Sequence, residues 1–245
     1  MSTYNELTSQ ILDELKLVSD DSHFVEEHIV FLLDKYRVFL LKQRYSDIKK
    51  EIPESNYQTI CVDLESTTGT NGLSLSGNYL KSVNPIPYMM EIGAKKITPT
   101  DFFAGNINYV SSSRFKYAGS SRYSNNQIFG TIAPDHYLYI KSCNSQAYHL
   151  KQVKLTGIFE DASVGFEYQC ADANGNKECD IMNAEFPIEE SLVIPMIQMV
   201  IQELSGLKYN AADSKNNAND DLSDLAQYIR QQLALGRRSD LYQNP

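Results

Sequence analysis

Residues 57–64, YQTICVDL, mark the point at which the periodicity of the chain changes. Ile60, Val62 and Leu64 alternate with Thr59, Cys61 and Asp63, and this period of two is typical of a half-buried β-strand. Before this stretch, apolar residues recur at three- and four-residue steps, as they do on the faces of helices. Short strand-like runs follow it, so the chain changes here from a helical part to a β-rich part.

The segment before this strand, residues 24–50, carries the strongest helical pattern of the sequence. One apolar stripe consists of Val25, Ile29, Leu32, Leu33, Tyr36 and Leu40. A second stripe, at seven-residue spacing, consists of Phe24, Phe31, Val38 and Tyr45. A helix with two apolar faces packs on more than one side. We therefore expect the second stripe to be a subunit interface, unless it packs within its own domain.

The first residues of the chain predict a shorter helix. Thr3 and Glu6 have the spacing of a capping box, in which each side chain satisfies a free N–H at a helix start.

The segment after residue 64 predicts a sheet of short strands. Residues 66–78 are rich in Ser, Thr, Gly and Asn and predict an exposed loop. The strand candidates are Asn106–Val110, Arg114–Tyr117, Ile128–Ile132, Tyr137–Lys141 and Leu150–Phe159. Pro134 in the sequence 133–136 predicts a hairpin turn between the third and fourth of these candidates. Strands at this spacing favour an antiparallel sheet or a small barrel.

Helical patterns return after residue 180. Pro187 followed by Glu189 and Glu190 predicts a helix start. The nearly continuous apolar run 192–201 predicts a helix that is buried on all sides, with a kink at Pro195 and an end at Gly206. A last helix is expected from about residue 222 to 235, and residues 236–245 form a tail.

The expected fold class is α+β. The N- and C-terminal segments, residues 1–56 and 181–235, form one helical bundle, because neither end alone can cover its apolar faces. Residues 57–180 form an inserted β-rich module, an antiparallel sheet or a small barrel, and the tail follows.

The sequence contains none of the common catalytic motifs. There is no G-x-S-x-G, H-E-x-x-H, P-loop or G-x-G-x-x-G pattern. The four histidines, His23, His28, His136 and His149, have no spacing that suits a shared metal. The run 172–180 places Gly175 too early for an EF-hand and is better explained as a turn in a hairpin. We expect no enzyme activity, no catalytic residue, no cofactor and no metal.

The four cysteines, Cys61, Cys143, Cys170 and Cys179, include no C-x-x-C pair. Reduced, partly buried thiols are the simplest expectation for a chain made in a cytosol. Cys170 and Cys179 flank the predicted turn and would pair only under oxidising conditions, so their pairing stays open.

Charge and hydropathy limit the partners. The net charge of −9 opposes tight, sequence-independent binding of nucleic acid but suits a wall past which DNA must slide. No run approaches the roughly 18 apolar residues of a membrane helix. The chain has 16 Tyr and no Trp, and tyrosine suits protein–protein contacts.

Three stretches carry a resemblance to a known family. They are residues 15–37, which contain LKLVSDDSHF and FLLDKYR; residues 41–59, LKQRYSDIKKEIPESNYQT; and, near the C-terminus, FPIEE (186–190) with NNANDDLSDL (216–225). In these the chain is similar to ring proteins of crAss-like phages, the tailed viruses of gut Bacteroidales. The resemblance is close in the helical parts and weaker within residues 66–84 and 118–127.

The resemblance implies a head-to-tail adaptor or connector in the virion. Such a protein is assembled in the host bacterial cytoplasm and forms a twelve-fold ring, a homododecamer, below the portal protein and above another tail or ring protein. The ring extends the channel through which DNA is ejected. By analogy with such adaptors, the portal contact would involve Leu233, Arg237, Arg238, Leu241 and Tyr242.

Two other functions are weighed beside the ring. The tyrosine-rich β module would suit a host-glycan-binding or recognition function, which the absence of Trp disfavours. A peptidoglycan-cleaving enzyme would use Asp63, Glu65 or Glu160 as its carboxylates, although no cleft is evident around them.

Overall fold

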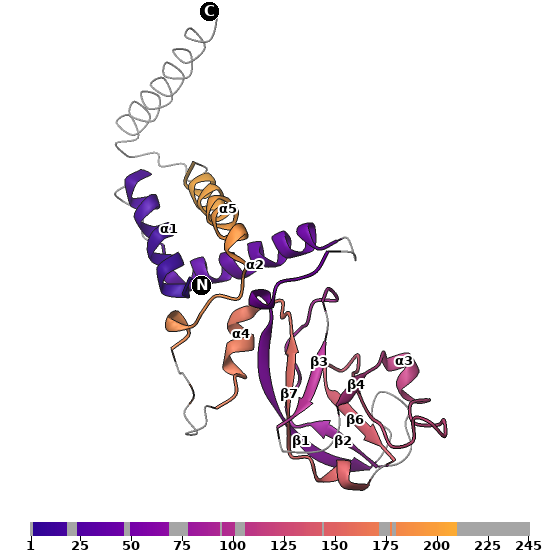
Figure 1. The fold of residues 1–245 in the computed structure, drawn as a ribbon. Coiled ribbons are helices and arrows are strands. Elements are labelled where there is room, and N and C mark those ends of the chain that lie inside the picture. Colours follow the sequence, from indigo (N-terminus) through magenta and orange to yellow (C-terminus); the bar gives the residue numbers. More distant parts are fainter. Residues whose placement is uncertain are drawn as a thin grey trace, which may run out of the picture.

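The computed structural model describes residues 2–18, 24–46, 50–68, 78–93, 95–100, 106–143, 145–171, 177 and 180–209 (Figure 1). The helices among these residues are α1 (Tyr4–Val18), α2 (Glu26–Arg44), α3 (Ser112–Phe115), α4 (Ala162–Glu167) and α5 (Glu190–Tyr209). The strands are β1 (Gln58–Thr68), β2 (Asn78–Ser82), β3 (Lys96–Pro99), β4 (Ile107–Tyr109), β5 (Ile128–Ile132), β6 (Leu138–Ser142) and β7 (Gln152–Gly157). None of the described helices is long and apolar enough to cross a bilayer.

The seven strands form a closed barrel in the order β1-β2-β6-β5-β4-β3-β7. The length of β1 is what allows the barrel to close. Its first half, Gln58–Asp63, pairs with β7, and its second half, Leu64–Thr68, pairs with β2. Closure leaves no open sheet edge. All pairs are antiparallel except β4 with β5, which run parallel.

The barrel interior is filled by alternating side chains. Ile60 and Val62 of β1 are buried, whereas Thr59 and Asp63 are exposed, so the alternation expected from the sequence is confirmed. The other buried members of this core are Leu80, Ile86, Ile97, Ile107, Ile128, Leu138, Ile140, Ala147, Leu150, Val153, Leu155 and Phe159. A packed interior of this kind is a core and not a channel.

The long helices α1, α2 and α5 pack together beyond one end of the barrel, and α4 lies between them and the strands (Figure 1). Ile158 and Ala162, which follow β7, belong to the same buried cluster as the helical side chains, so the two cores meet there. The capping box is confirmed at the start of α1. The Glu6 N–H donates to Thr3 Oγ1 at 3.2 Å, and the Thr3 N–H donates to Glu6 Oε2 at 3.0 Å.

The expected fold class is wrong. The described chain is rich in sheet, with a closed barrel as its principal body, and is not a helical bundle interrupted by an antiparallel sheet. The parallel β4–β5 pair also departs from an antiparallel module. The expected last helix lies outside the described residues, and the predicted domain boundaries at 56/57 and 180/181 stay predictions.

Several local predictions also need correction. The expected strand Arg114–Tyr117 is the short helix α3 followed by turns, while β2 and β3 were not predicted at all. Helix α5 begins at Glu190, three residues after Pro187, and continues past both Pro195 and Gly206. It is not buried on all sides, because Ile194 is 67% exposed.

The predicted hairpin turn is confirmed. The His136 N–H donates to Ala133 O at 2.9 Å, and β5 and β6 pair on either side of the turn.

Candidate subunit interface

A buried arginine fixes the inner face of α2. The Arg37 guanidinium is fully buried and donates to three backbone carbonyls: Nε to Pro187 O at 2.7 Å, Nη1 to Phe159 O at 2.7 Å and Nη2 to Asn56 O at 3.2 Å. These carbonyls belong to the segments before α5, after β7 and before β1. One side chain therefore joins the places where the chain enters and leaves the barrel.

Asp34 lies one helical turn before Arg37 and is also buried. Its Oδ2 accepts from the Ser163 N–H at 3.2 Å and from Ser163 Oγ at 2.7 Å, and its Oδ1 accepts from Tyr4 Oη at 3.4 Å. Burial raises the pKa of Asp34, while the Ser163 hydrogen bonds and Arg37 oppose that shift. Burial likewise lowers the pKa of Arg37, and the Asp34 charge opposes this. The two groups hold α1, α2 and α4 together.

A second cluster surrounds Glu189, just before α5. Its carboxylate accepts from Tyr45 Oη at 2.5 Å and from Ser191 Oγ at 2.9 Å, and it pairs with Arg44 Nε at 2.8 Å. Burial, followed by the hydrogen bond to Glu189, raises the pKa of Tyr45. The C-terminal end of α2 is thereby fixed to the start of α5.

The four residues predicted to form the subunit interface do not share one environment. Phe24 and Val38 are half-buried against the helical core, and Tyr45 is buried in it. Phe31 is 62% exposed, and the His28 ring stacks on it with centroids 6.4 Å apart. Among the four, Phe31 presents the largest apolar surface to a neighbour. The predicted contact itself stays a prediction.

Two exposed apolar residues, one on α2 and one on α5, were not predicted from the sequence. Phe39 on α2 is 52% exposed, and Ile194 lies on α5, which packs against α2. Phe31, Lys35 and Phe39 are spaced by four residues and so share one face of the helix. The sequence contains this four-residue spacing, whereas the predicted stripe has a seven-residue spacing and includes Val38 in place of Phe39.

Lys35 is tied to α5 on this face. Its Nζ lies 2.9 Å from Glu203 Oε1, and Tyr36 Oη donates to Glu203 Oε2. The exposed face of α2 thus lies on a helix that is held on its inner side and along its border with α5. A surface of this kind can form a subunit contact without first changing shape.

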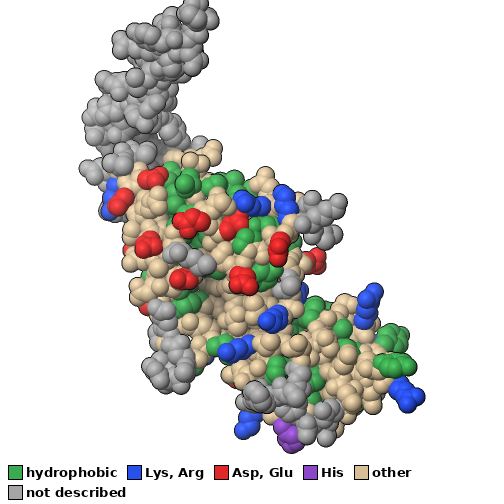
Figure 2. Space-filling view, viewed as in Figure 1, with side chains coloured by type: hydrophobic (Ala, Val, Ile, Leu, Met, Phe, Trp, Pro, Cys, Tyr) green, Lys and Arg blue, Asp and Glu red, His purple; other side chains and the backbone are tan. Residues whose placement is uncertain are grey.

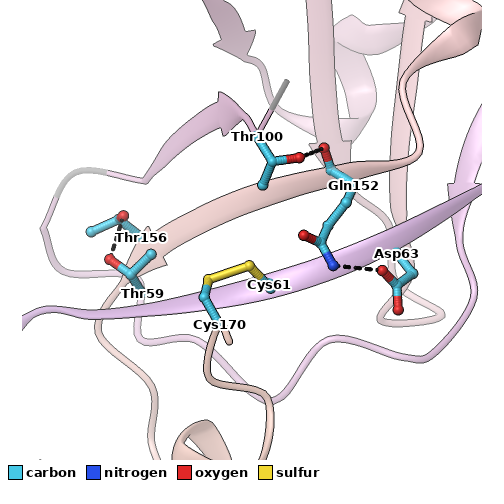
Figure 3. The surroundings of a disulfide bond; sticks show 7 residues. All are labelled: Thr59, Cys61, Asp63, Thr100, Gln152, Thr156 and Cys170. Atoms are coloured by element: carbon cyan, nitrogen blue, oxygen red, sulfur yellow. Dashed lines mark hydrogen bonds between the residues drawn. A yellow bond between two sulfur atoms is a disulfide. The ribbon is translucent and has the colours of Figure 1, made fainter. Parts of the chain in front are cut away.

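The cysteines differ from expectation. Cys61 and Cys170 form a disulfide between residues 109 apart in sequence, so neither is a reduced thiol and Cys170 does not pair with Cys179 (Figure 3). The bond lies on the outer face of β1 among polar contacts, including Thr59 with Thr156 at 2.8 Å and Gln152 Nε2 with Asp63 Oδ1 at 2.7 Å (Figure 3). Cys143 is a free, exposed thiol. Cys179 lies outside the described residues.

Of the three carboxylates weighed as catalytic, Asp63 and Glu160 have structural partners, and Glu65 is exposed on β1. Asp63 accepts from Gln152, and Glu160 pairs with Lys42 Nζ at 3.2 Å across the boundary between the barrel and α2. Within the described ranges, no group of three or more His, Cys, Asp or Glu side chains could hold a metal ion. The five residues expected to contact the portal, Leu233, Arg237, Arg238, Leu241 and Tyr242, lie outside these ranges.

Comparisons with known proteins cover most of the chain. A family model described as phage tail ring protein 2 matches residues 6–222. Ring protein 2 of Bacteroides phage crAss001 is 49% identical over 223 residues, which are 91% of this chain and 99% of that relative. The matched region includes all the described strands and helices except the first two residues of α1, and it ends before the five residues expected to contact the portal.

Proposed function

Since the chain belongs to the phage tail ring protein 2 family of crAss-like phages, and is thus a structural protein of the virion tail, we propose that its ring lies directly below the portal. The ring joins the capsid to the tail, extends the DNA channel and rests on another tail or ring protein. It contains twelve copies and is assembled in the host cytoplasm. The observation that carries the assembly role is the exposed apolar face of α2 on a helix whose inner face is fixed.

The ring geometry requires each copy to carry two different contact surfaces, because neighbours around a closed ring meet head to tail. The face of α2 that carries Phe31 and Phe39 supplies one of them. Its phenylalanines are exposed in the isolated chain and would be covered by the next copy, which removes apolar surface from water. Large exposed aromatic side chains are typical anchors of such contacts.

Substitution of Phe31 tests this contact. Phe31→Ser should leave the monomer folded, because the side chain is mostly exposed, but should reduce the fraction of ring formed together with the portal. The matched control is Val83→Ser, which removes an exposed apolar side chain that follows β2 on the barrel. Native mass spectrometry of both variants measures the ring. Equal ring formation by the two variants would show that Phe31 does not lie in the subunit interface.

The portal contact is assigned to Leu233, Arg237, Arg238, Leu241 and Tyr242. A short segment that is repeated in every copy contributes most once the ring has gathered its copies, because the contacts then act together. Replacement of the last four of these residues by Ala should abolish co-purification with portal rings. The control Ser239→Ala/Gln243→Ala, in the same tail, should leave it intact. Retention of the portal by the fourfold variant would contradict the assignment.

The predicted relation to DNA is passage without tight binding. The net charge of −9 repels phosphates on average and favours sliding. No catalytic residue, cofactor or metal enters this function.

A further inference from the structure

Charge is divided unevenly between the barrel and the rest of the chain. Residues 58–157, from the start of β1 to the end of β7, contain nine Lys and Arg against five Asp and Glu, a net charge of +4. The remainder contains 13 Lys and Arg against 26 Asp and Glu, a net charge of −13. On the face shown in Figure 2, the acidic side chains gather over the helices, and the barrel carries mainly basic ones.

One corner of the barrel carries three basic side chains and no acidic ones. Residues 102–134 contain no Asp or Glu, while residues 111–127, the connection between β4 and β5, carry Arg114, Lys116 and Arg122. All three side chains are exposed, and none takes part in the four ion pairs formed within the described part of the chain. We call residues 111–127 the basic corner.

Tyrosines accompany these cations. Tyr117 is 67% exposed and Tyr123 is 92% exposed, and Lys116 Nζ lies 4.8 Å from the centre of the Tyr117 ring. In Figure 2 basic and apolar side chains lie together at the corner where α3 projects in Figure 1. Tyr and Arg are enriched at protein–protein interfaces, and Tyr, Ser and Asn are common in antibody binding loops.

The basic corner has a defined shape. Phe115 is fully buried against Tyr79, Phe129 and Tyr139, which anchors the connection on the barrel. Successive backbone hydrogen bonds, such as Tyr117 N–H to Arg114 O and the turns around residues 120–127, fold the rest. Little ordering is therefore needed when a partner binds.

We propose that the basic corner docks on the acidic outer face of α1 in a second copy of the chain. Opposite its buried stripe, α1 exposes Glu6, Asp13 and Glu14, with only Lys16 to offset them. Of the other carboxylates in the helical part, Asp34 and Glu189 are buried, and Glu160 and Glu203 have lysine partners. Asp13 of α1 also has one, Lys16 at 3.7 Å, but both side chains are mostly exposed, so this pair is weak. Glu26 and Glu27 at the start of α2 are exposed as well, but they are only two adjacent carboxylates, whereas those of α1 extend over two turns. This contact deepens the proposed ring, because it names the complementary pair of surfaces that neighbouring copies would bring together.

Passing DNA is the competing polyanion. The basic corner of each copy has only a few cations with which to bind DNA phosphates. The rest of the chain, with its net charge of −13, repels phosphates. In a closed ring, the neighbour's α1 is held at an effective concentration on the order of mM, as for any linked binding partner. The acidic helix of the next copy is therefore the favoured occupant.

Photo-crosslinking within assembled rings tests the contact. Tyr123 is replaced by the photoreactive p-benzoylphenylalanine, which its exposure allows without disturbing the fold, and Val83 receives the same residue as the control. On irradiation, position 123 should give a covalent dimer whose crosslinked peptide comes from residues 4–18 of the second copy. Position 83 should not.

Charge reversal provides a second measurement on the same rings. Asp13→Lys/Glu14→Lys should reduce the dimer yield severalfold, and adding Arg114→Glu/Arg122→Glu should restore it. Crosslinks from position 123 to DNA, to glycan, to another virion protein or to other parts of the chain would overturn the inference while leaving the ring in place. A chain that never multimerises, alone, with portal or in particles, would contradict the proposed function as well.

Discussion

At the scale of single residues, Arg37 is a buried polar side chain that joins three segments of the described chain. Its side chain is fully buried, donates to three backbone carbonyls and lies near the Asp34 carboxylate. A buried charge is tolerated only when its hydrogen-bonding capacity is met, and Arg37 meets that condition with groups from three separate segments. Its sequence context gave no sign of this, because Arg37 lies between two apolar stripes like an ordinary exposed residue.

Removing this guanidinium should therefore be costly. Arg37→Met keeps the length of the side chain but leaves the Asn56, Phe159 and Pro187 carbonyls without their donor, and it removes the positive charge near the buried Asp34 carboxylate. We expect the free energy of unfolding to fall by about 3–5 kcal/mol, as for other broken buried pairs. Urea unfolding followed by circular dichroism measures the change.

The matched control is Lys42→Met on the same helix. Lys42 pairs with Glu160 at the surface, so its loss should change stability by no more than about 1 kcal/mol. An Arg37→Met variant as stable as the Lys42→Met variant would show that the buried cluster does not hold the helices to the barrel.

At the scale of elements, the sequence predicted those features that depend on residues close together in the chain. The capping box of α1, the alternation in β1 and the turn at Pro134 each depend on a few neighbouring residues, and all three are present. The expected strand 114–117 is wrong because Phe115 is buried as the anchor of a turn-rich connection and not as one residue of an alternating strand. Strands β2 and β3 are only five and four residues long and depend on pairing partners far away in sequence.

The pairing of α2 with α5 predicts a dependence on pH. The hydrogen bond from Tyr36, followed by that from Lys35, lowers the pKa of Glu203 below its ordinary value of 4.5. A lowered pKa means that the folded state favours the carboxylate. The stabilisation is therefore present above about pH 4.5 and is lost as the pH falls through the lowered pKa.

Glu203→Gln should remove that dependence. The wild-type chain should be more stable than the variant by about 0.5–1 kcal/mol at pH 7, since the pair is partly exposed, and the difference should vanish in acid. Thermal unfolding at a series of pH values measures it, with Glu185→Gln as the control on an exposed carboxylate. A difference that grows as the pH falls would contradict the account.

The disulfide links β1 to the segment after α4, and its effect depends on the redox state. Closing a loop of about 100 residues restricts the unfolded chain by up to roughly 4.7 kcal/mol in the entropic model. Cys170→Ser should therefore lower the free energy of unfolding by about 2–5 kcal/mol in oxidised protein and should have no such effect in the presence of a reductant.

The free thiol provides the control for the disulfide. Cys143→Ser should change the free energy of unfolding little under either condition, because Cys143 is exposed, forms no disulfide and makes only a long hydrogen bond to Gly119 O at 3.9 Å. Equal stability of wild type and Cys170→Ser under oxidising conditions would show that the bond is not formed in solution.

At the scale of the whole molecule, the fold differs from the one that the sequence predicted. Two helical ends around a β-rich middle suggested a helical bundle with an insertion, but barrel closure depends on β1 pairing with both β2 and β7. The periodicity of apolar residues along the chain cannot predict which distant strands pair. At the candidate interface Phe31 was predicted. The sequence places Phe39 on the same helix face, but the exposure of Phe39 and of Ile194 depends on tertiary packing, which spacing alone does not give.

The division of charge is also a property of the whole chain. The total of −9 gave no sign that the barrel is basic and the remainder strongly acidic. A ring whose copies present opposite charges to one another gains orientation as well as attraction, since like-charged arrangements are disfavoured.

A three-dimensional reconstruction of the virion neck with this protein labelled tests the central claim most directly. The account predicts twelve copies arranged as a closed ring immediately below the portal, with the axial channel continuous through both. Label found elsewhere on the particle, or density at that level that does not accommodate the barrel and its helices, would contradict it.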